Sequence, residues 1–179
     1  MTKFAIDECN KILNNPDDYL LMDAEMTGVG NQDEIIELAL IDLNGNEIYH
    51  GMYYPEVSIS IEAGYIHNIK EEDLFDCPQF CEAWPEIFAK LNEKTLLIYN
   101  ARSDIQMMYQ TLKKQKTKTP MIKNICVQQL YEKFRGLKRS VKLELACEQM
   151  GLSFEQNHRA TDDCIMTLEL IKAMAKTEL

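Results

Sequence analysis

Long apolar runs, glycine, proline and basic residues are all scarce in this 179-residue sequence, which limits what the chain can be. No hydrophobic stretch approaches the roughly 20 residues that a membrane-spanning helix needs, so we expect no membrane partner. The 7 glycines and 5 prolines form no repeat or low-complexity segment, and the hydrophobic share of 46% is typical of a globular domain. Because 29 acidic residues outnumber 19 basic ones, the net charge is −10. Such a chain repels polyanions at long range unless a local basic rim or bound divalent cations attract them.

Paired cysteine motifs are also absent, since the six cysteines are scattered without a C-x-x-C pair. The start of the chain, "MTKFAIDECNKIL", is interrupted by Asp7, Glu8 and Lys11 and lacks the pattern of a signal peptide. We therefore expect a cytoplasmic protein whose thiols are reduced and mostly buried. Cys77 and Cys81 near His67 suggest zinc as an alternative, but their spacing is poor and no fourth ligand is evident.

The periodicity of apolar residues predicts an α/β fold. We expect strands at 19–25, 34–43, 47–54, 95–99 and 125–127, with a hairpin turn at "NGN" (44–46). We expect helices at 3–13, from Trp84–Pro85, from the cap Ser103, and at 128–135, 141–150 and 160–176, with a basic loop at 113–123. Three early strands followed by alternating helix and strand predict a mixed sheet covered by helices. One domain over residues 1–179 is expected, with 1–15 as a short helical extension.

The stretch "LLMDAEMTGV" (20–29) places two acids in a strand that is otherwise apolar. Alternate residues of a strand share a face, so Leu21, Asp23 and Glu25 point to one side, and Met22 and Ala24 point to the other. An uncompensated carboxylate on a packed face costs several kcal/mol or takes up a proton. A cation held by both carboxylates explains the pair. The alternative is an edge strand whose polar end reaches water.

Acids occupy comparable positions in two later segments. In "YNARSDIQMM", Asp104 shares a helical face with Met107 and Met108, although an acid in a first turn also suits the helix dipole. In "NHRATDDCIMTLELI", His158 and Asp163 bracket the start of the last helix, where a solvated helix start is the alternative. Each segment taken alone has a structural explanation. Their combination and order do not.

The three segments D-x-E, N-A-x-x-D and H-x-A-x-x-D resemble, in this order, the motifs of the DEDDh family of 3′-to-5′ exonucleases. That family includes the proofreading subunit of bacterial replicative polymerase and oligoribonuclease. The Thr27–Gly28 turn, "EIIELALI", "YIHNIKEEDL" and "VKLELACEQMGL" extend the resemblance over roughly residues 19–176. The matching site residues are Asp23, Glu25, Asp104, His158 and Asp163. The family often has an aromatic residue just before its second-motif acid, whereas this chain has Ser103 beside Arg102.

The resemblance implies a ribonuclease H-like fold: three early antiparallel strands, then parallel strands, with helices on both faces. It implies a single exonuclease domain that is a phosphodiester hydrolase. Two Mg²⁺ or Mn²⁺ ions are expected on Asp23, Glu25, Asp104 and Asp163, with His158 as general base. The reaction expected is 3′–5′ release of 5′-mononucleotides from single-stranded or frayed 3′ ends by two-metal-ion hydrolysis.

The substrate and partners are less constrained by the motifs. DNA is favoured because "YIHNIKEEDL" resembles the DNA-processing branches, whereas "DAEMTG" and "HRATDD" also resemble oligoribonuclease. A polymerase or repair partner is the further expectation, and a catalytically weak docking module is the second alternative. Candidates for guiding the strand to the site are the basic residues Lys113, Lys114, Lys116, Lys118, Arg135, Lys138, Arg139 and Arg159.

Overall fold

The structure is a computed structural model, and it describes residues 2–154 and 158–178. The five strands are β1 (Tyr19–Met26), β2 (Ile35–Ile41), β3 (Glu47–Met52), β4 (Thr95–Ile98) and β5 (Asn124–Cys126). The helices of the first half are α1 (Lys3–Leu13), α2 (Ile61–His67) and α3 (Phe80–Lys90), with 3-10 turns at Pro16–Asp18 and Glu71–Leu74. Those of the second half are α4 (Ala101–Lys114), α5 (Val127–Arg135), α6 (Leu143–Gln149) and α7 (Ala160–Ala175). None of the helices described combines the length and apolar character that crossing a bilayer requires.

The strands form one mixed sheet in the order β3-β2-β1-β4-β5. β1 pairs antiparallel with β2, and β2 pairs antiparallel with β3 across the turn at Asn44–Asn46. In that turn the Asp42 carboxylate accepts hydrogen bonds from the backbone N–H groups of Asn44 and Asn46. β4 and β5 are parallel to β1, because the chain returns through helices before each of them. The predicted mixed sheet, with three antiparallel strands followed by parallel strands, is confirmed.

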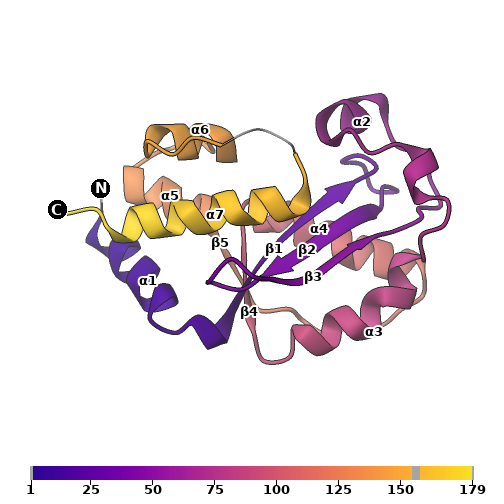
Figure 1. Cartoon of the computed structure of the whole chain (residues 1–179), viewed down its shortest axis with the longest axis horizontal. Helices are drawn as coiled ribbons and strands as arrows, with labels where there is room; N and C mark the ends of the chain where they lie inside the picture. Colours follow the sequence, from indigo (N-terminus) through magenta and orange to yellow (C-terminus); the bar gives the residue numbers. More distant parts are fainter. Residues whose placement is uncertain (1, 155–157, 179) are drawn as a thin grey trace.

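Helices pack on both faces of the sheet (Figure 1). Alternating side chains of the strands enter two apolar cores, one on each face. Leu21, Ala39 and Leu97 face a core shared with α1, α5, α6 and α7. Leu20, Met22 and Leu96 face the other core, shared with α3 and α4. The separation of Leu21 from Met22 agrees with the predicted alternation along β1. α7 packs directly against β1 and β2, so its first turn lies beside the sheet.

Three predicted element boundaries are wrong. α3 starts at Phe80 and not near Trp84–Pro85, because the Glu82 carboxylate accepts from the Gln79 N–H at 2.8 Å and closes an earlier first turn. Ser103 is not a cap, since α4 begins at Ala101. The predicted loop 113–123 starts too early, because α4 continues to Lys114.

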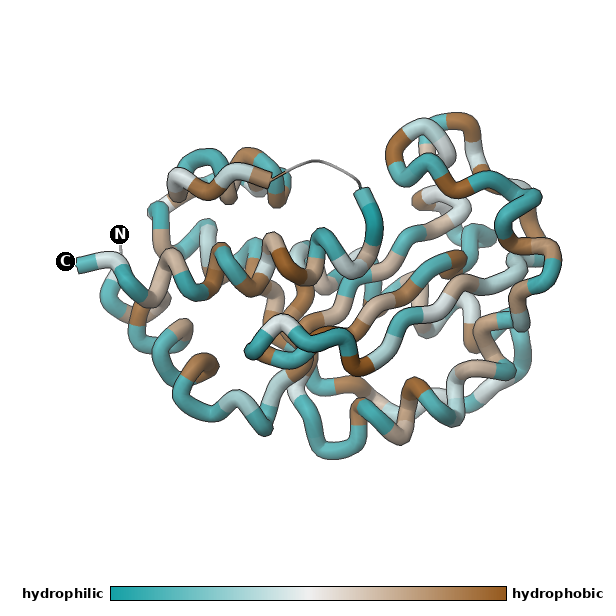
Figure 2. The backbone as a smooth tube through the Cα atoms, in the orientation of Figure 1, coloured by the Kyte–Doolittle hydropathy of each residue, from teal (hydrophilic) through white to brown (hydrophobic). Residues whose placement is uncertain are grey.

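Helix α2 was not predicted at all. It lies next to the end of β1 (Figure 1), and Ser60 caps it by accepting from the Ala63 N–H at 3.1 Å. Ile61, Tyr65 and Ile66 are exposed, and hydrophobic colour on this outlying helix is visible in Figure 2. Only His67 of α2 is buried, so the segment has no apolar stripe that periodicity could detect.

Candidate active site

The first two acids of the site lie at the end of β1, on the face covered by α7. Asp23 and Glu25 pair with Ala39 and Glu37 of β2, and the register shifts between Glu25 and Met26. A bulge of this kind ends regular pairing and redirects the side chains that follow it. Both carboxylates are only partly exposed, because the strand runs through the middle of the sheet.

Helices α4 and α7 bring two further acids to the same place. Asp104 in the first turn of α4 is 5% exposed, and backbone N–H groups, including that of Ala24 on β1, hydrogen bond its carboxylate. Asp163 lies in the first turn of α7. Single carboxylate oxygens of Asp23, Glu25 and Asp163 all lie within 4.8 Å of one another. Segments distant in sequence therefore converge at one end of the central strand.

The electrostatics of the site are dominated by the burial of its acids and by their mutual repulsion. Burial, followed by repulsion from Asp104 and Asp163, raises the pKa of Asp23 well above its usual range. Burial also raises the pKa of Glu25 to about 8, that of Asp104 to about 7 and that of Asp163 to about 6. Carboxylates at such spacing cannot all ionise near neutral pH without a cation.

His158 lies beside this cluster and not inside it. Its charge acts on Asp163 and lowers the pKa of that acid, in opposition to burial. Nδ1 of the ring faces Oε1 of Glu144 on α6 at 3.8 Å, and both side chains are 29% exposed. His158 also has a left-handed backbone with φ of 44°, which is strained for a residue with a side chain. It borders a cavity of about 530 Å³ between α6 and α7.

The turn after β1 is organised by Thr27 and Asp33. The Thr27 hydroxyl donates to Asp33 Oδ1 at 2.8 Å and accepts from the Glu34 N–H at 3.0 Å. A Cβ at Gly28 would lie 2.7 Å from Asp33 Oδ2, so a side chain at this position would clash with Asp33. The predicted Thr27–Gly28 turn therefore closes tightly over the end of the acidic strand.

Comparison with known proteins agrees with this arrangement. The family model RNase_T, described as Exonuclease, matches residues 20–171. The chain belongs to the RNase_T exonuclease family. Over 173 residues it is 32% identical to a protein named uncharacterized exonuclease CP81 of Escherichia phage 186, covering 89% of each chain. It is 28% identical to the PolC-type DNA polymerase III of Clostridium perfringens, of which it spans 11%.

The fold is shared with solved exonucleases. A 3′-exonuclease described in specific recognition of a histone mRNA stem-loop superposes with a TM-score of 0.75 at 17% identity, covering 88% of this chain and 63% of the other. In this chain the four acids and the histidine of the candidate site stand in the order of the DEDDh motifs. As a member of this family the chain is an exonuclease, which is a phosphodiester hydrolase.

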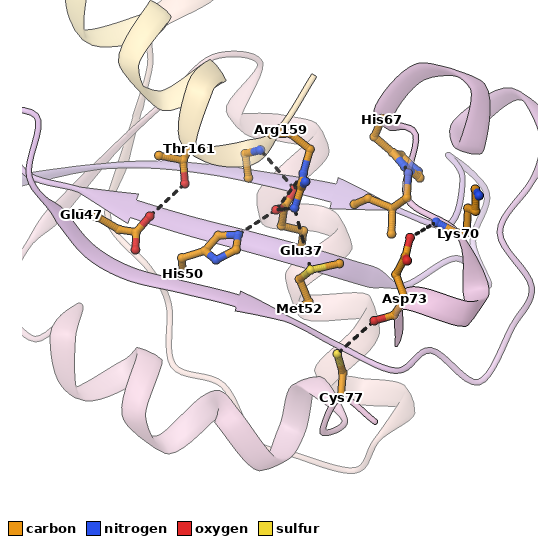
Figure 3. Close-up of polar contacts among 12 residues, drawn as sticks. Glu37, Glu47, His50, Met52, His67, Lys70, Asp73, Cys77, Arg159 and Thr161 are labelled. Carbon is orange, nitrogen blue, oxygen red and sulfur yellow. Dashed lines mark hydrogen bonds and ion pairs between the residues drawn. The ribbon is translucent and has the colours of Figure 1, made fainter. Parts of the chain in front are cut away.

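Glu37 is a buried acid next to the site that was not predicted as part of it. It is 1% exposed and is the one charged residue of β2. Burial favours its neutral form, but hydrogen bonds from Arg159, His50 and the Ala160 N–H bring the pKa of Glu37 below its usual value. Figure 3 shows the Arg159 and His50 side chains directed at this carboxylate. A lone charge within "IIELALI" is the same signal that singled out Asp23.

The zinc alternative finds no geometric basis. His67 is buried, its Nε2 lies 3.3 Å from the Met26 carbonyl oxygen, and its Nδ1 accepts from the Ile69 N–H. The thiol of Cys77 donates to the Asp73 carbonyl. Among the residues described, no metal-compatible group contains these side chains. His67 ties α2 to the end of the acidic strand.

The eight basic candidates fall into two sets. Lys114 pairs with buried Glu34, and Arg159 pairs with Glu37, so both are engaged within the protein. The others are exposed in the described structure: Lys113, Lys116, Lys118, Arg135, Lys138 and Arg139.

Proposed function

We propose that this exonuclease uses Mg²⁺ or Mn²⁺ to release 5′-mononucleotides one at a time from single-stranded or frayed 3′ ends, with DNA favoured over RNA. The observation that carries the proposal is the approach of Asp23, Glu25 and Asp163, whose carboxylate oxygens lie within 4.8 Å of one another. Such a cluster is unfavourable unless positive charge compensates it.

The residues present fit hard divalent cations. All the donors are carboxylate oxygens, which Mg²⁺ and Mn²⁺ prefer, and no thiolate of the described chain is among them. Burial and mutual repulsion raise the carboxyl pKa values, that of Glu25 to about 8, so bound cations would stabilise the ionised form of the cluster. Two ions bound together would stabilise charge on the reacting phosphate and favour ionisation of the attacking water.

We assign a role to each of the four acids. The charges of Asp104, Asp163 and Glu25 all act on Asp23, so Asp23 would be the shared ligand. Glu25 and Asp163 would hold the ion nearer the attacking water. Asp104 is buried, backbone N–H groups orient its carboxylate, and it is not among the three acids that lie within 4.8 Å of one another, so it would act as an outer ligand through water.

His158 is the proposed general base. It is beside Asp163 but outside the carboxylate cluster, so it is free to accept the proton of the attacking water. The water oxygen forms a bond to the terminal phosphorus, and the bond from phosphorus to the 3′ oxygen of the preceding nucleotide breaks. The 3′ oxygen takes up a proton from solvent, so that a 5′-mononucleotide leaves and the shortened strand ends in a new 3′ hydroxyl.

Substrate preference follows from the charge and shape of the chain. Removing the four site acids from the net charge of −10 leaves −6, so electrostatic capture of a strand is weak. Such an enzyme should act on ends that are cheap to unstack, which are single-stranded or frayed. Low intrinsic processivity, or delivery of the strand by a polymerase or repair partner, is expected.

DNA is favoured over RNA because of the resemblance of "YIHNIKEEDL" and the sequence similarity to a relative named as a DNA polymerase III. An oligoribonuclease-like activity is the second candidate, since a structural neighbour is described with histone mRNA. A docking module without catalysis is the third, and the presence of all five site residues argues against it.

The decisive assay uses the purified chain with 5′-labelled oligonucleotides of one sequence, made as DNA and as RNA, with Mg²⁺, Mn²⁺ or EDTA. We expect a descending ladder from DNA that needs metal and stops when the 3′ end is blocked. Faster degradation of RNA would favour the oligoribonuclease candidate. No degradation of either strand with metal would favour the docking module, and cleavage of a circular single strand would reveal an endonuclease.

A further inference from the structure

The buried Glu37 carboxylate connects β2 to the residue that follows His158. Arg159 Nε lies 3.0 Å from both Glu37 oxygens, and Arg159 Nη2 also donates to Oε1. The Ala160 N–H donates to Oε2 at 3.3 Å, and His50 Nε2 lies 2.7 Å from Oε1 (Figure 3). One carboxylate therefore holds both the side chain of Arg159 and the first turn of α7.

This contact has a local cost. Glu37 lies directly across from Glu25 in the β1–β2 register, so two carboxylates share one face of the sheet. A buried acid beside a metal-binding acid is unfavourable, and an apolar residue would suit the remainder of β2 better. Core packing alone therefore does not explain why a hydrogen-bonded carboxylate lies at this position of β2.

The start of α7 needs such a contact. The Arg159 side chain provides no cap, so the free N–H of Ala160 finds its acceptor on Glu37. The preceding residue, His158, has a φ of 44° that the surrounding structure must impose. Fixing Arg159 and Ala160 therefore fixes the chain between His158 and the first turn of α7, which carries Asp163.

We propose that Glu37 and Arg159 are positioning residues, a latch that holds the His158 backbone in its left-handed conformation and aims the imidazole at the site. The latch consists of Glu37, Arg159, His50 and the Ala160 N–H. It acts through His158 and does not contact substrate. This inference rests on the general-base role of His158 in the proposed function.

A competing role for Arg159 is a direct contact with substrate phosphate, since its side chain is 40% exposed. The two roles differ in kinetics. Loss of a phosphate contact made equally in the ground and transition states raises KM, whereas misplacement of the base lowers kcat. Arginine also presents a planar fork that lysine cannot reproduce, so Arg159→Lys keeps the charge but breaks the paired hydrogen bonds.

A double-mutant cycle tests the latch. We expect Glu37→Gln to lower kcat by about 10- to 100-fold, the range for groups that orient a reacting residue, with KM within about twofold. In a His158→Ala background the same substitution should change kcat by less than about twofold, because the group it positions is gone. Glu47→Gln is the matched control. Glu47 accepts from the Thr161 hydroxyl at 3.3 Å on the exposed side of α7, and its loss should leave kcat unchanged.

Three outcomes overturn the inference. An equal loss of kcat from Glu37→Gln with and without His158 would show that Glu37 acts independently of the base. A rise in KM at constant kcat for Arg159→Lys would make Arg159 a phosphate ligand. If Glu37→Gln does not fold, the same cycle is run with Arg159→Lys, and an equal loss of kcat with and without His158 would likewise overturn the inference. Normal kcat for His158→Ala would instead refute the proposed base, and the latch with it.

Discussion

Glu25 of β1 and Glu37 of β2 face each other across the antiparallel pair, yet the two acids are in opposite electrostatic situations. The charge of Glu37 is balanced within the protein by Arg159, and His50 Nε2 lies 2.7 Å from the same carboxylate. In the part of the chain that the structure describes, Glu25 has no comparable ion pair, and burial followed by repulsion from Asp163 and Glu37 raises its pKa to about 8. The sheet thus places Glu37, whose charge is balanced by Arg159, next to Glu25, whose charge the proposed metal ions would balance.

Replacing the central acid should separate metal binding from folding. Asp23→Asn is expected to abolish turnover, because the variant loses the proposed shared ligand. In EDTA near pH 8 its Tm should equal or exceed that of the wild type, since a buried carboxylate surrounded by like charges is removed. Calorimetry with Mn²⁺ and thermal unfolding measure both effects. Full wild-type activity in EDTA would contradict the metal-dependent mechanism.

Removing the His158 side chain should lower the rate of hydrolysis without changing metal affinity. His158→Ala is expected to lower kcat by roughly two to four orders of magnitude, the range for loss of a general base. Mn²⁺ affinity should barely change, because His158 lies outside the carboxylate cluster. Single-turnover kinetics and calorimetric titration give the two quantities. A collapse of Mn²⁺ affinity would identify His158 as a ligand.

The raised carboxyl pKa values predict a specific dependence of stability on pH. Without metal, folded Glu25 holds its proton up to about pH 8, whereas an ordinary glutamate releases it near pH 4.5. The folded state therefore binds more protons than the unfolded state between these values, and the free energy of unfolding should fall as pH rises through this window.

Thermal unfolding in EDTA at several pH values measures this effect. Glu25→Gln should flatten the profile, and saturating Mn²⁺ should restore stability at pH 8 because cation binding displaces the protons. Exposed Asp7→Asn is a control that should leave the profile unchanged. An identical slope for the wild type and Glu25→Gln would contradict the assignment of this proton to Glu25.

The sequence predicts those parts of the fold and of the site that depend on local patterns of apolar and charged residues. Strand alternation put Leu21 and Met22 on opposite faces correctly, because period-2 burial is written directly into β1. The convergence of Asp23 with Asp163 required the resemblance, since spacing alone does not bring α7 to β1. Glu37 was missed although it carries the same signal as Asp23, a charge in a buried strand.

Other features depend on partners distant in sequence. Ser103 satisfies the local rule for a cap, but α4 begins two residues earlier, at Ala101. The starting point of α3 depends in part on Gln115, whose side-chain oxygen accepts from the Cys81 N–H at 2.7 Å. From the sequence, Arg159 is predicted to be a basic residue that guides the substrate, whereas the structure shows that it pairs with Glu37. Tertiary contacts of this kind leave no local pattern.

The neighbouring acids Asp162 and Asp163 offer a matched pair for the last prediction. Successive helical residues differ by about 100° on the helix wheel, so only one of the two can aim squarely at the site. Asp163 supplies an oxygen to the cluster with Asp23 and Glu25, and Asp162 does not, among the residues described.

The burial of α7 agrees with this choice of acid. Asp163 shares its helical face with Ala160, Met166 and Leu170, which are all buried. Asp162 lies toward the partly exposed Glu169–Lys172 ion pair, which is 2.8 Å long.

Asp163→Asn should therefore reduce kcat by at least about a hundredfold, as expected for loss of a metal ligand worth several kcal/mol. Asp162→Asn should stay within about twofold of wild type, because that side chain contributes no oxygen to the cluster. Steady-state kinetics of both variants, with melting curves to establish folding, decide the matter. Inactivity of the Asp162 variant with a normal Asp163 variant would mean that the motif uses a spacing of four residues after His158, and the helix register assigned here would be wrong.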